Sequence, residues 1–207
     1  MAEQKKKGLS RLNKAILFLI TSAFFFALMN MFVRLSGDVP TIQKTFFRNF
    51  FALFIASGAM IKNRCSIILP KGARFDLFMR AAYTFVRRAT GKGVKSYYVV
   101  FFFSAFSTLV AFPLMLLDFK PMTLVQTLML VGSGVSAAIA QFCITTAYSY
   151  APANEVSIYD YSQIIFAALI GFVVLDQVPD VLSFVGYAVI IAAAFVMFRY
   201  NNRKTKE

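Results

Sequence analysis

Residues 141–177, QFCITTAYSYAPANEVSIYDYSQIIFAALIGFVVLDQ, join two long apolar segments through a short polar elbow. The elbow contains Pro152 and Glu155, and it is followed at once by Asp160 and Gln163. Carboxylate and amide groups at the mouth of a lipid-length apolar run are costly, so they usually pair, line a cavity or mark a pathway. We therefore expect the remaining segments to be helices packed around a site at this elbow.

The composition of the whole chain is that of a membrane protein. Hydrophobic residues make up 59% of the 207 residues, and the mean hydropathy is +0.67. An ordinary soluble domain has an apolar content of roughly 45–50%. Here the apolar residues fall in runs of about 20, which is the length of a transmembrane helix. The sequence therefore predicts an all-α fold, a polytopic helical membrane protein.

The apolar runs predict six transmembrane helices, over 15–34, 42–61, 97–117, 123–148, 157–175 and 181–198. A basic loop, 62–96, separates the second run from the third, and its apolar residues recur at helical spacing over 73–88. A basic amphipathic helix of this kind lies in the membrane surface without crossing it. We expect six crossings plus one interfacial amphipathic helix.

The net charge of +13 comes from 22 Lys and Arg against 9 Asp and Glu. The basic residues sit between apolar runs, as positive-inside loops do, which argues against nucleic acid as a partner. Anionic lipid headgroups are the expected partner of these charges. With six crossings, all but four basic residues (Arg34, Lys44, Arg48 and Lys120) fall on the side that holds both termini. Both termini are therefore expected in the cytoplasm, with the chain in the cell membrane.

The residue types of catalytic and metal sites are scarce. The chain has no His, and its only cysteines are Cys65 in the basic loop and Cys143 inside an apolar run. The nine acidic residues form no paired-acid motif within a helix. We expect no cofactor, no metal and no enzymatic activity.

Polar residues on the apolar runs give seven candidate solute-binding positions: Asn30, Arg48, Gln141, Tyr148, Tyr159, Asp160 and Gln163. Each also has a structural interpretation. Asn30 could form an interhelical hydrogen bond, and Arg48 could snorkel to the interface. Asp160 could stabilise the positive N-terminal end of a helix dipole. The tyrosines could belong to an interfacial aromatic belt. We further predict that Gln141, Tyr148, Asp160 and Gln163 face one another between two adjacent antiparallel helices.

Several phrases resemble the drug/metabolite transporter superfamily, and within it the EamA-type transporters: FFRNF at 46–50, AYTFVRR at 82–88, FFFSAF at 101–106 and the long stretch 147–187. This resemblance implies ten helices in two inverted repeats, with a midplane site between the repeats. It also implies transport of a small organic solute, a metabolite or a drug. Coupling to protons or sodium would then use Asp160, the only acidic group on the polar face of a span.

The chain departs from that plan in its middle, where the family's third to sixth helices are missing from the pattern. The expected organisation is a two-helix remnant of the first repeat (1–61), a basic cytoplasmic loop at the junction (62–96), the four-helix second repeat (97–200) and a basic cytoplasmic tail (201–207). A second departure is Asp176-Gln177, where many members have a Gly-Glu pair. We therefore expect an impaired transporter; the alternative is a non-transporting membrane remnant or helper that acts only as a homo-oligomer.

Overall fold

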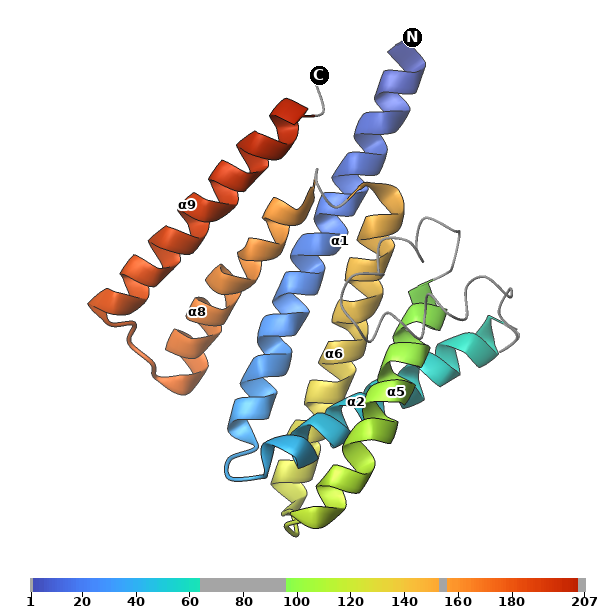
Figure 1. The fold of residues 1–207 in the computed structure, drawn as a ribbon, viewed down its shortest axis with the longest axis vertical. Helices are drawn as coiled ribbons and strands as arrows, with labels where there is room; N and C mark the ends of the chain where they lie inside the picture. The colour runs from blue at the N-terminus through green and yellow to red at the C-terminus, as the bar shows by residue number, and fades with distance from the viewer. Residues whose placement is uncertain (1, 64–95, 153–155, 205–207) are drawn as a thin grey trace.

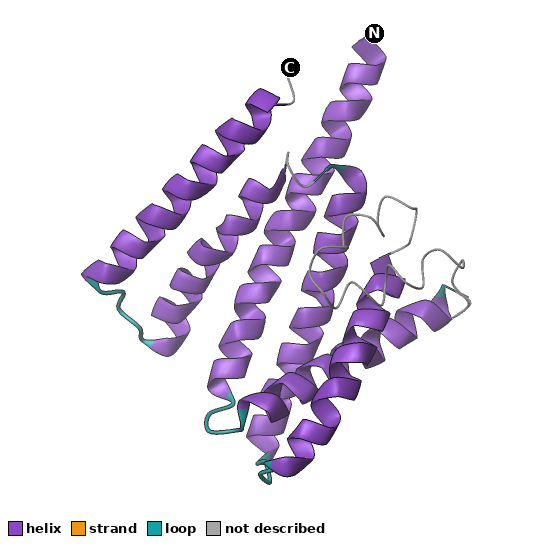
Figure 2. Ribbon diagram, in the orientation of Figure 1, coloured by secondary structure: helices purple, strands orange, loops and turns teal. Residues whose placement is uncertain are grey.

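The computed structural model describes residues 2–63, 96–152 and 156–204, and within them every regular element is a helix (Figures 1 and 2). The elements are α1 (Ala2–Leu35), α2 (Thr41–Lys62), α5 (Ser96–Leu117), α6 (Leu124–Tyr150), the 3₁₀ helix η2 (Ser157–Tyr161), α8 (Ser162–Leu175) and α9 (Val181–Lys204). The predicted all-α fold is confirmed. The proposed interfacial helix at 73–88 and the elbow residues 153–155 lie outside the described residues.

Four segments are long and apolar enough to cross a membrane: Arg11–Leu35, Tyr97–Leu117, Leu124–Tyr150 and Ser157–Leu175. Val181–Met197 is a shorter apolar helix. The segment α2 is helical over the predicted range, but Lys44, Arg48 and Lys62 lower its apolar character. The chain is therefore a multi-pass helical membrane protein, and a total of six crossings stays a prediction.

Helix α1 lies between α8 and α6, and α9 lies on the outer side of α8 (Figure 1). Helix α2 runs obliquely to the others and packs on α5 and α6. Successive helices alternate in direction, so both termini lie at the same end of the molecule (Figure 1). The prediction that the helices 123–148 and 157–175 are adjacent is wrong, because α1 packs between α6 and α8.

Small residues let α1 and α6 approach closely. Ala23 and Ala27 of α1 are buried, as is Ala140 of α6. The hydroxyl of Ser22 donates a hydrogen bond to the carbonyl oxygen of Ala140 at 2.9 Å, so the two backbones must lie near each other. Close backbone approach through small residues is the usual basis of helix association in a bilayer, where water exclusion supplies no drive.

Glycine serves the same purpose where α2 crosses α6. A Cβ atom added at Gly134 would overlap the Cβ of Phe51 and would lie 3.0 Å from the carbonyl oxygen of Arg48. On the α1 side, a Cβ at Gly132 would lie 3.2 Å from the ring of Phe32. Helix α6 is therefore packed by α1 on one side and by α2 on the other.

A glutamine joins α2 to the loop between α5 and α6. The side chain of Gln43 is fully buried. Its Nε2 donates to the carbonyl oxygen of Lys120 at 2.8 Å, and its Oε1 accepts from the Lys120 backbone N–H at 3.0 Å. Beyond this loop, Thr123 and Gln126 form a capping box that begins α6.

Two aspartates shape the loop between α8 and α9. Asp176 ends α8 in the left-handed region, with φ 48°. Asp180 begins α9, because its carboxylate accepts the backbone N–H of Ser183 at 2.8 Å and the Ser183 hydroxyl at 2.5 Å. These hydrogen bonds from Ser183 hold the pKa of Asp180 below its ordinary value.

Candidate solute site at the elbow

Two of the seven candidate residues form a direct hydrogen bond. The hydroxyl of Tyr148 donates to Oδ2 of Asp160 at 2.7 Å. Tyr148 lies in the last turns of α6, and Asp160 lies in η2, the turn that leads into α8. Both side chains are half-buried. The bond therefore ties the end of one long helix to the start of the next, next to the N-terminal half of α1.

An apolar cluster fixes this geometry. Val156, at the start of η2, is fully buried against Ala15 and Leu19 of α1 and Ala147 of α6. Tyr148, Tyr159 and several partly buried side chains of α1 pack against the same cluster. The burial of Val156 holds η2 against the end of α6, so Asp160 is brought within reach of Tyr148. Tyr159 is placed by packing, in line with a structural role.

The two candidate glutamines flank the pair without joining it. Gln141 lies two turns before Tyr148 on α6, and Gln163 lies one turn after Asp160 on α8. Both are half-buried, and neither side chain forms a hydrogen bond within the described part of the chain. Their amide donors and acceptors are therefore unused within the described part of the chain.

The remaining two candidates lie elsewhere. Asn30 is exposed on α1, toward the end at which α1 stops. Arg48 is half-buried in α2, and its guanidinium has no hydrogen-bond partner among the described residues. No contact joins either side chain to the Tyr148–Asp160 pair. The seven residues therefore do not form one cluster around the elbow.

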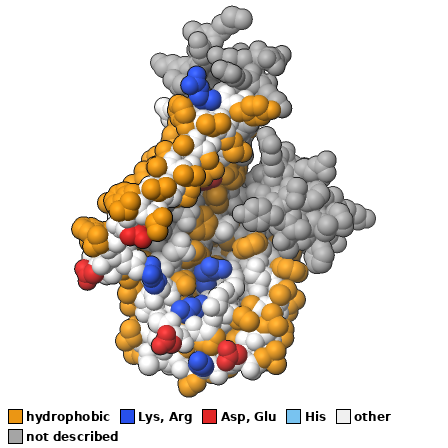
Figure 3. Space-filling view, turned by 60° about the vertical axis from the view of Figure 1, so that its left-hand side comes forward, with side chains coloured by type: hydrophobic (Ala, Val, Ile, Leu, Met, Phe, Trp, Pro, Cys, Tyr) orange, Lys and Arg blue, Asp and Glu red, His pale blue; other side chains and the backbone are white. Residues whose placement is uncertain are grey.

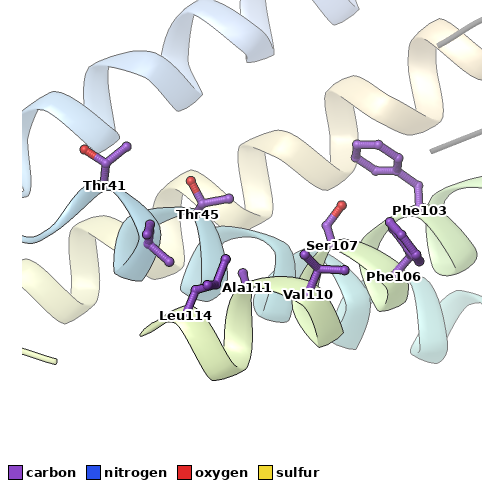
Figure 4. Close-up of a pocket in the computed structure, with 9 residues that line it drawn as sticks. Thr41, Thr45, Phe103, Phe106, Ser107, Val110, Ala111 and Leu114 are labelled. Atoms are coloured by element: carbon purple, nitrogen blue, oxygen red, sulfur yellow. The ribbon is translucent and has the colours of Figure 1, made fainter. Parts of the chain in front are cut away.

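A groove of about 340 Å³ lies between α2 and α5, and sequence reasoning did not find it (Figure 4). Its lining is mainly apolar and aromatic, with hydroxyl groups from three residues: Thr41, Thr45 and Ser107. None of the seven candidate residues lines it. The α2 and α5 residues at the groove belong to apolar runs, so only their relative placement in the fold brings them together.

A second polar contact lies at the opposite end of α8. The guanidinium Nη1 of Arg34, at the end of α1, donates to Oε1 of Gln177 at 2.7 Å. Figure 3 shows basic and acidic side chains gathered toward the lower end of this face. Sequence reasoning had no signal for this partner of Arg34, which lies 143 residues further along the chain.

Within the described ranges, no three His, Cys, Asp or Glu side chains gather in a way that could hold a metal ion. The chemistry available at the elbow is that of hydrogen bonding and proton binding. A carboxylate can accept hydrogen bonds when ionised and can donate one when protonated, and the phenol and the two amides offer both donors and acceptors.

Comparison with known proteins agrees with this architecture. Residues 73–199 match the EamA-like transporter family. The pseudopaline exporter of Pseudomonas aeruginosa is 34% identical over 135 residues, which are 65% of this chain and 47% of the exporter. The riboflavin transporter of Vibrio cholerae is 28% identical over 143 residues, which are 67% of this chain and 46% of that transporter.

The chain spans about half the length of the curated relatives it matches. No solved structure matches it significantly. The family match nevertheless covers more than half of the chain, including α5, α6, α8 and most of α9. The chain therefore belongs to the EamA-like transporter family.

Proposed function

We propose that this chain carries a small organic solute across the cell membrane, using the polar surface at the elbow between α6 and α8. The observation that carries the proposal is the hydrogen bond between Tyr148 and Asp160. Both side chains are half-buried beside the apolar cluster of α1, α6 and Val156. Family membership supports transport as the activity. The relatives are named for pseudopaline and for riboflavin, which supports a small organic solute as the cargo.

Asp160 is the residue that couples the solute to an ion in this proposal. Its ionised carboxylate accepts the Tyr148 hydroxyl. When the carboxylate binds a proton it becomes a donor itself, so it can exchange Tyr148 for a solute acceptor. Gln141 and Gln163 lie on either side and add amide donors and acceptors. A proton gradient would then drive the movement of the solute.

The test measures riboflavin uptake, by its fluorescence, into proteoliposomes with an imposed pH gradient. The expected result is saturable, gradient-dependent uptake by the wild-type chain. Asp160→Asn should abolish the dependence on the gradient, and Tyr148→Phe should reduce uptake by roughly tenfold, equivalent to about 1.4 kcal/mol. Asp118→Asn, which changes an exposed carboxylate in the α5–α6 loop, is the matched control and should transport normally.

Riboflavin is one probe for the solute class, and pseudopaline is the second. If neither is carried at any protein density, the alternative of a non-transporting remnant gains support. If both are carried by the Asp160→Asn variant with unchanged gradient dependence, the proposed coupling role of Asp160 is wrong while transport stands. The two parts of the proposal therefore fail separately.

We propose that both termini face the cytoplasm, on the basis of the charge distribution. All but four of the 22 basic residues fall on that side if the chain crosses six times. Labelling of Cys65, and of an introduced Lys204→Cys, with an impermeant maleimide should occur only after the cells are opened. Labelling of either cysteine in intact cells would show that the orientation is inverted or mixed.

A further inference from the structure

The groove between α2 and α5 combines an apolar lining with hydroxyl groups from both helices (Figure 4). Thr45 of α2 and Ser107 of α5 are half-buried in it, and Thr41, the first residue of α2, adds a third hydroxyl. The other lining side chains are apolar: Ile42, Phe103, Phe106, Val110, Ala111 and Leu114. No charged side chain lines the groove within the described chain, so the groove suits an uncharged occupant.

The sizes of the side chains explain why the two helices leave a space here. The ring of Phe46 packs on Ala111 and Met115 and holds α2 against the last turns of α5. Beside this contact the lining side chains Thr45, Ala111 and Ser107 are all small, so they leave the volume between the helices unfilled (Figure 4). The resulting space of about 340 Å³ is of the size that small-molecule sites have.

The groove opens toward the bilayer. Its α5 wall belongs to Tyr97–Leu117, a segment long and apolar enough to cross a membrane. The wall residues Phe103, Val110 and Leu114 are all exposed on the surface of the described chain. An occupant therefore reaches the groove sideways from the apolar phase of the membrane.

The hydroxyls in the groove differ from others on the long helices. Thr21 of α1 donates to the carbonyl oxygen of Leu17 at 2.9 Å, and Ser57 of α2 donates to that of Leu53 at 2.8 Å. Bonding to the carbonyl one turn earlier is a common way for a hydroxyl within a helix to be satisfied. The groove hydroxyls form no hydrogen bond among the described residues: Thr41, Thr45 and Ser107.

These free hydroxyls indicate what the occupant must offer. A lipid acyl chain would leave each O–H without an acceptor in an apolar place, which is unfavourable. A molecule with a carbonyl oxygen would accept from them, and its rings would pack on the aromatic side chains Phe103 and Phe106. An apolar lining with a few polar groups that fix orientation is the usual composition of a small-molecule site.

We propose that the groove between α2 and α5 binds an uncharged aromatic molecule whose carbonyl oxygen accepts hydrogen bonds from Thr45 and Ser107. This site is separate from the Tyr148–Asp160 pair, since neither of those residues lines the groove. The inference goes beyond the proposed transport function, because it concerns binding alone and needs no movement of a solute across the membrane.

The test uses photolabelling by benzophenone, an uncharged two-ring ketone that forms bonds to nearby C–H groups on irradiation. The full chain is placed in lipid nanodiscs, and mass spectrometry identifies the labelled peptides. Labelling of α2 and α5 should saturate with benzophenone concentration. Labelling of α9, which exposes apolar side chains along its length, is the background and should rise without saturation.

Competition measures the contribution of the carbonyl group. Fluorenone and fluorene have the same rings and differ only in that group, and their concentrations are corrected for partition into the lipid. Fluorenone should compete at a concentration roughly 2- to 10-fold lower, which corresponds to one net hydrogen bond. Thr45→Val or Ser107→Ala should reduce this difference and leave competition by fluorene unchanged. Thr21→Val, whose hydroxyl is already bonded within α1, is the control and should keep the difference.

Two tryptophan variants test the position of the site. Val110→Trp places a large ring in the groove and should remove the saturable labelling. Leu109→Trp changes the preceding residue, which is 73% exposed and does not line the groove, and should retain the labelling. If Val110→Trp fails to fold, the competition measurements on Thr45→Val still decide.

The proposal is overturned if the wild-type chain shows no saturable labelling of α2 and α5. Equal competition by fluorenone and fluorene would also overturn it, because the groove would then be an apolar slot that a lipid acyl chain fills. Loss of the labelling in oligomers would do the same, since a second copy would then be the occupant. Saturable labelling combined with no riboflavin uptake would count against the transport function and not against this site.

Discussion

Gly134 leaves no room for a side chain where α6 meets α2. The added Cβ would meet backbone and Cβ atoms of α2, at Arg48 and Phe51, which cannot rotate away. The same helix carries a row of small residues at four-residue spacing, Gly132, Ser136 and Ala140, of which Ser136 and Ala140 are buried. The role of Gly134 was not predictable, because it depends on which helix covers the other side of α6.

Gly134→Ala should destabilise the protein by about 1–3 kcal/mol, since α2 must move to admit the methyl group. Gly58→Ala is the matched control, because a Cβ at Gly58 of α2 has nothing within 4 Å. The control should change the unfolding free energy by about 1 kcal/mol or less, in the stabilising direction. Unfolding of the detergent-solubilised protein by added denaturant gives both values, and equal losses in the two variants would contradict the packing argument.

Asp176 explains a departure from the family at the residue scale. The family resemblance led us to expect a Gly-Glu pair where this chain has Asp176-Gln177. The structure puts Asp176 in the left-handed region at the C-terminus of α8, where φ is 48°. Glycine adopts this conformation without the steric conflict of a Cβ atom. A glycine expected at this position therefore has a local conformational reason, which only the structure reveals.

Asp176→Gly should raise the stability of the protein by about 0.5–1 kcal/mol. Relief of roughly 1–2 kcal/mol of conformational strain exceeds the roughly 0.4–1 kcal/mol that glycine adds to the entropy of the unfolded chain. Asp118→Gly is the control, because Asp118 does not have a positive φ. Thermal unfolding should show a higher midpoint for the first variant and an equal or lower one for the second. A lower midpoint for Asp176→Gly would contradict the strain argument.

At the scale of elements, the sequence predicted where helices run better than how they pack. The predicted segments coincide with α1, α2, α5, α6, α8 and α9 to within a few residues, except where α1 and α9 extend beyond the apolar runs. The agreement arises because the length of each apolar run largely determines where its helix begins and ends. The order of helices in space was wrong at one point, since α1 lies between α6 and α8. Nothing in a single helix specifies which neighbour its small residues will meet.

The candidate site was accordingly predictable in part. Tyr148 and Asp160 are close in sequence, 12 residues apart, and the elbow between them brings them together. Arg34 and Gln177 are 143 residues apart, and only the finished bundle makes them partners. Local chemistry thus identified one end of the α1–α8 seam, and the opposite end required the structure.

The two hydrogen bonds between Gln43 of α2 and the Lys120 backbone in the α5–α6 loop give a prediction at the scale of elements. Gln43→Leu keeps the approximate volume but leaves the N–H and carbonyl of Lys120 without their partner in a part-buried place. The expected loss of stability is about 2–3 kcal/mol. The control is Gln141→Leu, since the half-buried Gln141 side chain makes no hydrogen bond within the described residues. Denaturant unfolding measures the unfolding free energy of both variants. If Gln43→Leu loses no more than the control, the Gln43–Lys120 hydrogen bonds add no stability.

At the scale of the whole molecule, the described surface is mostly apolar but carries polar groups without partners. Large apolar side chains are exposed along α5, α8 and α9, as expected for helices that meet lipid. Asn30 is exposed on α1 within a segment long enough to span the membrane. Each unpaired polar group in hydrocarbon costs on the order of 1–3 kcal/mol, which favours a partner that can satisfy it.

The last prediction is that a single copy of this chain transports little and that copies associate in the membrane. Carriers built from two repeats move one repeat against the other around a shared site, and this chain spans about half the length of its curated relatives. If the chain crosses six times, nearly all basic residues fall on one side, so the copies should associate in parallel and not in opposite orientations. The purified protein should therefore form oligomers in mild detergent.

Asn30→Leu should weaken this association, because it removes the exposed amide of α1 that would form a hydrogen bond with another copy. The control on the same helix is Leu17→Ala, which changes a side chain that is 65% exposed and apolar, and it should associate normally. Cross-linking before solubilisation gives the fraction of oligomers, and riboflavin uptake by separated monomers and oligomers in liposomes gives their activity. Uptake should accompany the oligomers alone. Saturable uptake by cross-link-verified monomers would mean that one copy already contains the whole pathway, and the association would then have another role.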